Sequence, residues 1–356
     1  MLRALISWLS ELFGSAPKAP LPPPPPSKML GDAPPPNPAP KVTFPVPTPA
    51  HFYLAQSGVY PETITQQGTV FTMGMIHSLF YDPNSFSGGI FDGIEPKGQQ
   101  LPTPQNEMLT SLLMSTYGGD LPETLGLPDL RGSAMWGPSP GMTPWPDTVP
   151  VTWLIATASQ PPPPVYAPGA AAPLAGMIMP YAGQGAIAGW LPCTGGTYDP
   201  QQYPELAAAI GSNFDPARGN EGKVYPIPDL GWRVTMGAGG PITGSQGTTG
   251  IGDIMGEQSP EKTLWALCVT YLICLKGPWP YTVHPGPIPA TGGWIGQIVA
   301  YGGLIAPADW AVCDGSLLQI EEYMELFAMI GSQFGGDGAQ TFAVPDLRGK
   351  MMVGSS

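Results

Sequence analysis

Charged residues are scarce in this chain, since Asp, Glu, Lys and Arg make up only 11% of its 356 residues. The 13 basic residues stand against 26 acidic ones, which gives a net charge of -13 at pH 7. Proteins that bind nucleic acid neutralise phosphates with clustered Lys and Arg. The composition therefore excludes a nucleic-acid partner.

Histidine and cysteine are also sparse, with three and four copies and no C-x-x-C or H-x-x-x-H pattern. We therefore predict no metal site, assign no cofactor, and expect no disulfide framework. Cys268 and Cys274 stand six positions apart in an apolar run. This even spacing places both on one face of a strand, where we expect them to be small buried side chains.

Long apolar runs are absent as well, because stretches such as residues 264–275 are shorter than the roughly 20 residues of a membrane span. The N-terminus has helical i, i+3, i+4, i+7 spacing of its apolar residues, which are Leu2, Leu5, Ile6, Leu9, Leu12 and Phe13. A secretory signal would have an unbroken apolar core and more than one basic residue. We therefore predict an amphipathic anchoring helix over residues 1–15.

Proline and glycine are abundant instead, at 49 and 48 copies, yet the 10 Trp, 13 Tyr and 11 Phe can still build apolar cores. Residues 16–69 are predicted to form a Pro-rich arm, with the Pro-richest part at residues 16–49. In the polyproline form that part would reach about 100 Å, and a disordered tail is the alternative. Residues 161–175 and 281–295 are predicted to be Pro-rich linkers.

The motif PDLRG occurs at residues 128–132 and 345–349, and PDLGWR at residues 228–233 repeats it in part. Further residues recur at fixed spacings in front of these motifs. They are an opening glycine (Gly74, Gly176, Gly296), a residue 17 positions later (Phe91, Cys193, Cys313), a leucine (Leu109, Leu206, Leu326) and an aromatic residue eight positions after it (Tyr117, Phe214, Phe334). Such equal spacings indicate three copies of one folded unit.

The predicted fold is mainly β with short helices, of the α+β class, in three tandem units at residues 70–160, 176–280 and 296–356. Residues 203–211 and 323–331 are predicted helices, and short apolar runs between Gly and Pro are predicted strands. Units 1 and 2 close with strand-like runs, whereas unit 3 ends without one. Its closing strand is either dispensable or supplied by another segment or chain, and residues 41–60 have some strand character.

Unit 3 resembles the phage tail-collar domain of short tail fibres and tail-tip proteins, through GQIVAYGG, DWAVCDGS, YMELFAMIGSQFGGDG and TFAVPDLRG. Unit 2 resembles it through GMIMPYAG, GWLPCTGG, YPELAAAIG and PDL, and unit 1 more remotely through FDG, STYGGD and LPDLRG. Some fibres of this family bind metal through paired His, which this chain lacks, so no metal site is carried over.

The resemblance implies a non-enzymatic virion tail component that frequently contacts the host surface. Its expected partners are other tail or baseplate proteins, reached through the N-terminal arm, and a host glycan or protein. A structural adaptor that braces tail, baseplate or neck proteins is the alternative. Family fibres are often trimers, and three units in one chain could instead imitate a trimer as a pseudo-threefold monomer, or form a string of beads.

Two sets of residues are candidates for specific roles. Asp92 with Arg131, and Asp314 with Arg348, are predicted to form ion pairs that lock two loops of one unit, because unit 2 lacks both partners. Trp190 and Trp310 are candidate receptor contacts that could stack on sugars, with core packing as the other interpretation. The repeated acidic residues belong to scaffold loops and vary between units, and no H-E-x-x-H or P-loop motif occurs, so we predict no enzymatic activity.

Overall fold

The computed structural model describes residues 47–55, 75–79, 93–137, 148–156, 173–183, 187, 189–215, 224–240, 248–258, 263–277 and 293–354. All of them belong to one compact unit that spans Ala39–Ser356. The predicted anchoring helix, with Leu2, Leu5, Ile6, Leu9, Leu12 and Phe13, lies outside the described residues, as does Asp92. No helix in the described ranges is long and apolar enough to cross a membrane.

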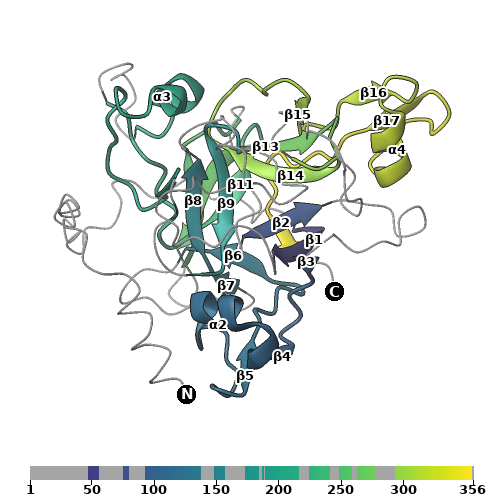
Figure 1. Cartoon of the computed structure of the whole chain (residues 1–356). Coiled ribbons are helices and arrows are strands. Elements are labelled where there is room, and N and C mark those ends of the chain that lie inside the picture. Colours follow the sequence, from purple (N-terminus) through teal and green to yellow (C-terminus); the bar gives the residue numbers. More distant parts are fainter. Residues whose placement is uncertain are drawn as a thin grey trace. The chain divides into compact units, whose positions relative to one another are not determined.

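One short α-helix marks each unit, and Figure 1 shows the three helices well apart around the strands. They are α2 (Glu107–Leu113), α3 (Pro204–Ile210) and α4 (Met324–Ile330), and the 3-10 helix η1 (Thr103–Gln105) precedes α2. The predicted helices of units 2 and 3 are thus confirmed. Each helix buries a leucine at its third position, which is Leu109, Leu206 or Leu326.

The mainly β fold is also confirmed, and its strands fall into equivalent groups. The opening strands are β2 (Ile76–Leu79), β9 (Met177–Tyr181) and β14 (Gln297–Tyr301); the second strands are β3 (Gly93–Ile94), β10 (Trp190–Pro192) and β15 (Trp310–Val312). Two small antiparallel sheets pair β4 (Gln100–Pro102) with β5 (Thr124–Gly126) and β16 (Leu317–Gln319) with β17 (Thr341–Ala343), with the helix of the unit between the two strands. The end strands are β6 (Ala134–Trp136), β11 (Arg233–Gly237) and β18 (Met352–Gly354).

The remaining strands close the units. They are β7 (Thr148–Pro150) with β8 (Thr152–Ala156) in unit 1, β13 (Thr263–Cys274) with its partner β12 (Ile254–Gln258) in unit 2, and β1 (Thr48–Ala55). Each closing strand pairs with the opening strand of the next unit in the same register. The equivalent pairs are Leu54 with Ile76, Ile155 with Ile178, and Ile273 with Ile298.

The three opening strands also pair with one another in a cycle. Met75 of unit 1 bridges Tyr181 of unit 2, and Met177 of unit 2 pairs with Tyr301 of unit 3. Gln297 of unit 3 then pairs with Leu79 of unit 1, which returns to the start. Because the same two positions meet at every step, the units are arranged around an approximate threefold axis within one chain.

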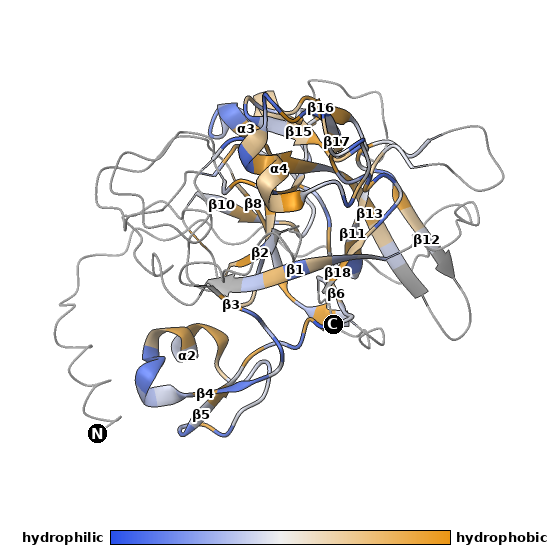
Figure 2. Ribbon diagram, turned by 90° about the vertical axis from the view of Figure 1, so that its right-hand side faces the viewer, coloured by the Kyte–Doolittle hydropathy of each residue, from blue (hydrophilic) through white to orange (hydrophobic). Residues whose placement is uncertain are grey.

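Strand β1 supplies the closing strand that unit 3 lacks. It pairs in parallel with β18, where Thr48 lies opposite Met352. The equivalent pairs are Met135 with Val149 in unit 1 and Thr235 with Leu267 in unit 2. Figure 2 shows β1 running past β18, with β3 at its other end. The predicted Pro-rich arm of residues 16–69 therefore contains a strand of the sheet, because unit 3 needs a partner for the free edge of β18.

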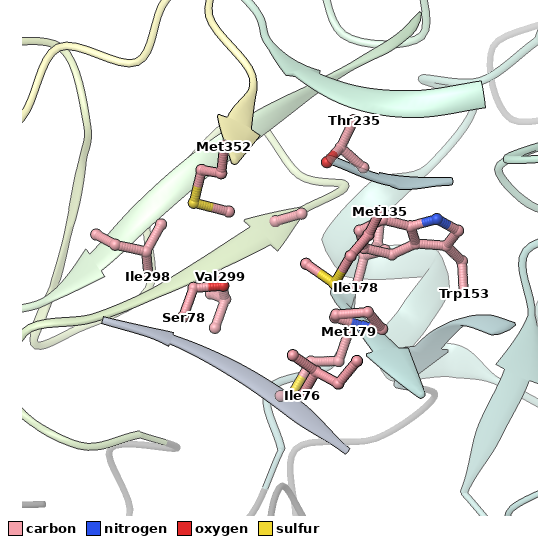
Figure 3. A pocket seen from close by; sticks show the side chains of 12 residues that line it. Ile76, Ser78, Met135, Trp153, Ile178, Met179, Thr235, Ile298, Val299 and Met352 are labelled. Carbon is pink, nitrogen blue, oxygen red and sulfur yellow. The ribbon is translucent and has the colours of Figure 1, made fainter. Parts of the chain in front are cut away.

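A small cavity lies in the core on this axis, and Figure 3 shows it from close by. Equivalent isoleucines from the three opening strands line it, together with equivalent residues of the end strands: Ile76, Ile178, Ile298, Met135, Thr235 and Met352. Its volume available to the centre of a water molecule is ≈ 10 Å³, enough for about one water. The cavity is therefore too small for a substrate or a cofactor.

We expect Phe52→Ala to destabilise the protein by about 3–5 kcal/mol, because Phe52 is a buried aromatic residue of the strand that closes the ring of units. Pro49→Ala, on an exposed position of the same strand, is the control and should change the free energy of unfolding little. Urea unfolding followed by tryptophan fluorescence measures both. A similar stability for the two variants would show that β1 does not hold the ring closed.

Candidate functional site: the PDL loops and the junctions between units

The repeated motif forms one loop in each unit, here called the PDL loop, at residues 128–132, 228–232 and 345–349. Its leucine is fully buried in every unit, as Leu130, Leu230 and Leu347. The N–H of that leucine donates to a carbonyl of the loop after the second strand: Pro96 at 3.0 Å, Cys193 at 2.8 Å and Cys313 at 2.9 Å. This backbone hydrogen bond and the buried leucine join the two loops of each unit.

The aspartate of each PDL loop holds the turn. The Asp346 carboxylate accepts the backbone N–H of Arg348 at 3.1 Å, and the Asp129 and Asp229 carboxylates accept the equivalent N–H groups at 3.2 and 3.0 Å. The Arg348 side chain also donates to both oxygens of Asp346, each at 2.9 Å. These hydrogen bonds lower the pKa of Asp346 and raise that of Arg348. The pair is local and about half-exposed.

The predicted ion pair between Asp314 and Arg348 is therefore wrong. Asp314 accepts hydrogen bonds from the backbone and hydroxyl of Ser316, and Arg348 pairs with Asp346 two positions before it. A planar guanidinium reaches a carboxylate on the same tight turn at little entropic cost. Unit 2 keeps this arrangement in spite of its changed sequence, because Arg233 pairs with Asp229 at 2.6 Å.

Asp92, the predicted partner of Arg131, lies outside the described residues, and the alignment of unit 1 differs from the expected one. Backbone bridges join Thr194 to Asp229 in unit 2 and Asp314 to Asp346 in unit 3, and the matching bridge in unit 1 joins Lys97 to Asp129. Lys97, and not Asp92, therefore occupies the position of Asp314. Arg131 donates to Asp129 at 2.6 Å and to the Lys97 carbonyl at 3.1 Å.

The spacing explains the error. Cys193 and Cys313 stand 17 residues after Gly176 and Gly296, whereas the equivalent Pro96 stands 22 residues after Gly74. Unit 1 thus carries five extra residues between its first two strands, and FDG at residues 91–93 matched the other units by chance. The pairing of β1 with β3 reveals the insertion, because it places Leu54 opposite Ile94. The sequence does not show this pairing.

Trp190 and Trp310 are not surface residues, so their predicted role as receptor contacts is wrong. Each side chain is 4% exposed and packs in a core cluster with Cys274 and Tyr301. They begin the equivalent strands β10 and β15, opposite Ala156 and Cys274. Their core-packing interpretation is the one that the structure supports. All four cysteines are buried, which confirms the expectation for Cys268 and Cys274.

Neighbouring units are joined at two junctions by the end strand of one unit and the PDL loop of the next. Trp232 N–H donates to the Gly137 carbonyl at 2.7 Å, and Gly349 N–H donates to the Gly237 carbonyl at 2.7 Å. A Cβ on Gly137 or Gly237 would collide with the carbonyl of Leu230 or Leu347. Glycine is therefore required where these backbones meet.

The third junction, between units 3 and 1, is built differently. The PDL-loop residues Gly132 and Ser133 form no hydrogen bond to β18 among the residues that the structure describes. A buried polar contact is present instead, where the Gln297 side-chain amide donates to His77 Nδ1 at 3.1 Å. Trp294 packs at 4.8 Å from the His77 ring. Burial lowers the pKa of His77 to about 3, so this histidine is neutral in the fold.

The contacts of the PDL loops are structural. No group of three or more His, Cys, Asp or Glu side chains that could hold a metal ion occurs within the described ranges. The PDL-loop carboxylates are each occupied by an arginine and a backbone N–H. The hydrogen bonds from arginine lower the pKa values of Asp129 and Asp346, and a carboxyl group with a lowered pKa is poorly suited to general acid catalysis.

Three separate regions of the chain match the family model of the Phage Tail Collar Domain: residues 94–135, 176–235 and 296–352. The prediction of three tandem copies is thereby confirmed. In unit 1 the match begins at Ile94, after FDG at residues 91–93, in agreement with the corrected alignment. Neither a curated protein nor a solved structure matches the chain significantly.

We expect Arg348→Ala to lower the free energy of unfolding by less than about 1 kcal/mol, because exposed ion pairs contribute little. Leu347→Ala should lower it by about 2–5 kcal/mol, since it empties a fully buried site in the same loop. Thermal and urea unfolding of both variants measure the difference. An equal or larger loss for Arg348→Ala would mean that the ion pair, and not the leucine, holds the loop.

Acid is expected to destabilise the fold through His77. The ordinary pKa of 6.5 applies to the unfolded chain, whereas the folded value is about 3. Between these values only the unfolded chain binds the proton, so the free energy of unfolding falls as the pH drops below 6.5. The loss from this residue is about 1.4 kcal/mol per pH unit, and it is absent above pH 6.5.

The variant His77→Met tests this expectation, because Met179 occupies the equivalent position of unit 2. Urea unfolding at pH 7 and pH 5 should show a smaller loss of stability for the variant than for the unchanged protein. Carboxyl groups titrate in both proteins, so the comparison isolates His77. The same loss in both proteins would contradict a neutral, buried His77.

Proposed function

Because the chain carries three copies of the phage tail collar domain, we propose that it is a non-enzymatic structural protein of the virion tail, a tail fibre or tail-tip component that contacts the host surface. Residues 1–46 attach it to other tail or baseplate proteins. The observation that carries this proposal is the position of β1, which follows that segment directly and closes the ring of three units. The proposed attachment segment is thus joined to the folded body directly through β1.

We further propose that the body works as a pseudo-threefold monomer. The equivalent pairings Leu54 with Ile76, Ile155 with Ile178 and Ile273 with Ile298 supply in one chain what three identical chains would supply in a homotrimer. Fusing the three units removes the need to assemble separate subunits. It also lets each unit carry different surface residues while the shared core is kept.

Host contact through Trp232 is the proposed replacement for Trp190 and Trp310. Trp232 stands at the position of Gly132 and Gly349 and, like them, has a positive φ, of 63°. A tryptophan in this conformation is strained, and its side chain remains 38% exposed. Strain that is retained at an exposed aromatic residue supports a role in binding, and a flat indole is suited to stacking on a sugar ring.

The alternative function, a structural adaptor between tail, baseplate or neck proteins, is favoured by a different feature. Leu304 and Ile305 are 70% and 84% exposed on the segment between β14 and β15. Two adjacent aliphatic side chains in solvent suit a protein partner better than a polar glycan. This feature belongs to unit 3, whereas Trp232 belongs to unit 2, so the two functions can be tested separately.

The deciding experiment adds purified full-length protein to host cells and measures the adsorption rate of the virus. Slower adsorption that is lost with Trp232→Gly supports host contact, and Trp232→Gly should fold well because glycine occurs at the two equivalent positions. Unchanged adsorption would refute host contact. Loss of the protein from purified virions on Leu304→Ser with Ile305→Ser would then support the adaptor. Absence of the unmodified protein from purified virions would refute a tail component altogether.

A further inference from the structure

Strand β1 belongs to unit 3 by its contacts but to unit 1 by its covalent connection. It lies between β18 and β2, in parallel with the first and antiparallel to the second. The other closing strands follow the end strand of their own unit along the chain, β7 after β6 and β13 after β11. Strand β1 is separated from β18 by nearly the whole sequence. No covalent link within unit 3 therefore holds its closing strand.

Without β1, two backbone edges and an apolar surface would be exposed to solvent. Strand β18 would lose its pairing partner, β2 would lose the partner on one of its two edges, and the site of the buried side chains Ala50, Phe52 and Tyr53 would be open. An unpaired strand edge beside an apolar surface takes up an extended segment of matching pattern. The acceptor site thus recognises one kind of ligand, an extended strand with the sequence pattern of residues 48–55.

We propose that this acceptor site can be filled by β1 of a second copy of the chain, so that neighbouring copies exchange closing strands. The contacts made by an exchanged β1 are identical to those made within one chain, so the exchange requires no new complementarity. Residues 56–74 connect β1 to unit 1 and are the segment that would cross between copies. This proposal concerns the folded body alone and does not depend on the proposed function.

The third junction is the place where such an exchange is least hindered. The two other junctions have the backbone hydrogen bonds of Trp232 to Gly137 and of Gly349 to Gly237 in addition to their strand pairs. In the described part of the chain, Gly132 and Ser133 provide no such bond to β18. Release of β1 therefore leaves units 3 and 1 joined by the pairing of β2 with β14 and by the contact of Gln297 with His77.

Concentration decides between the closed monomer and the exchanged assembly. A tethered strand acts at an effective concentration in the millimolar range, so dilute protein keeps its own β1. Copies crowded side by side would raise the concentration of foreign β1 to a comparable level. Exchange would then link neighbouring copies without any further interface.

Cysteine trapping tests the exchange in the full-length protein. Pro49 lies directly opposite Val353 in the β1–β18 pair, Pro49 is exposed and Val353 half-buried. The four native cysteines are buried, so they compete little for oxidation. Two proteins, one with Pro49→Cys and one with Val353→Cys, are mixed at high concentration, opened in mild urea, returned to buffer and oxidised. We expect covalent dimers of the two chains.

Pro150→Cys is the matched control, because Pro150 occupies the position of Pro49 on the closing strand of unit 1. A mixture of Pro150→Cys with Val353→Cys should give only background dimer. The double variant Pro49→Cys with Val353→Cys, oxidised when dilute, should form the bond within one chain. No dimer above background in the test mixture would overturn the exchange if the double variant forms its internal bond, and failure of that bond would overturn the acceptor site itself.

Refolding the unmodified protein at rising concentration gives the same test without cysteine. Exchanged dimers should increase with the refolding concentration, and they should persist for hours after dilution because β1 must leave its site before they can separate. Size-exclusion chromatography measures both properties. Monomer alone at every refolding concentration would overturn the proposal, whatever the result with the cysteine variants.

Discussion

Strand edges that need a partner are the constraint on which this structure depends. Each opening strand would be left with an unpaired edge in an isolated unit, and burying unpaired N–H and C=O groups is costly. The chain meets this constraint by a cycle in which β2, β9 and β14 pair with one another and each also pairs with the closing strand before it. The approximate threefold axis, the central core and the position of β1 all follow from that cycle.

The PDL loops show how one short motif holds a turn and fills the core in each of the three units. Its aspartate and leucine do the same work in every unit, because the turn must be held and the core must be filled at the same place. The arginine and glycine are less constrained. Unit 2 places its arginine two positions later and has Trp232 where the others have glycine, yet its loop keeps the ion pair and the positive φ.

Sequence reasoning failed where it assumed equal spacing and long-range pairing. The insertion in unit 1 displaced Asp92 from the position that Lys97 occupies, and no local signal distinguishes FDG at residues 91–93 from a true copy of the motif. Asp314 and Arg348 were expected to pair across two loops because unit 2 lacks both charged residues at the matching positions. Arg348 instead pairs with Asp346, because this carboxylate lies only two residues away on the same turn.

The sequence by itself determined the number of units, their resemblance to the tail-collar domain, the helices of units 2 and 3 and the burial of Cys268 and Cys274, because each of these follows from local pattern and from repetition. It also indicated that residues 41–60 have strand character. Only the tertiary structure decided that this strand completes unit 3, that the units close around an axis, and that Trp190 and Trp310 are buried. Strand pairing joins residues that are far apart in sequence, and no local pattern specifies which free edge a given strand will fill.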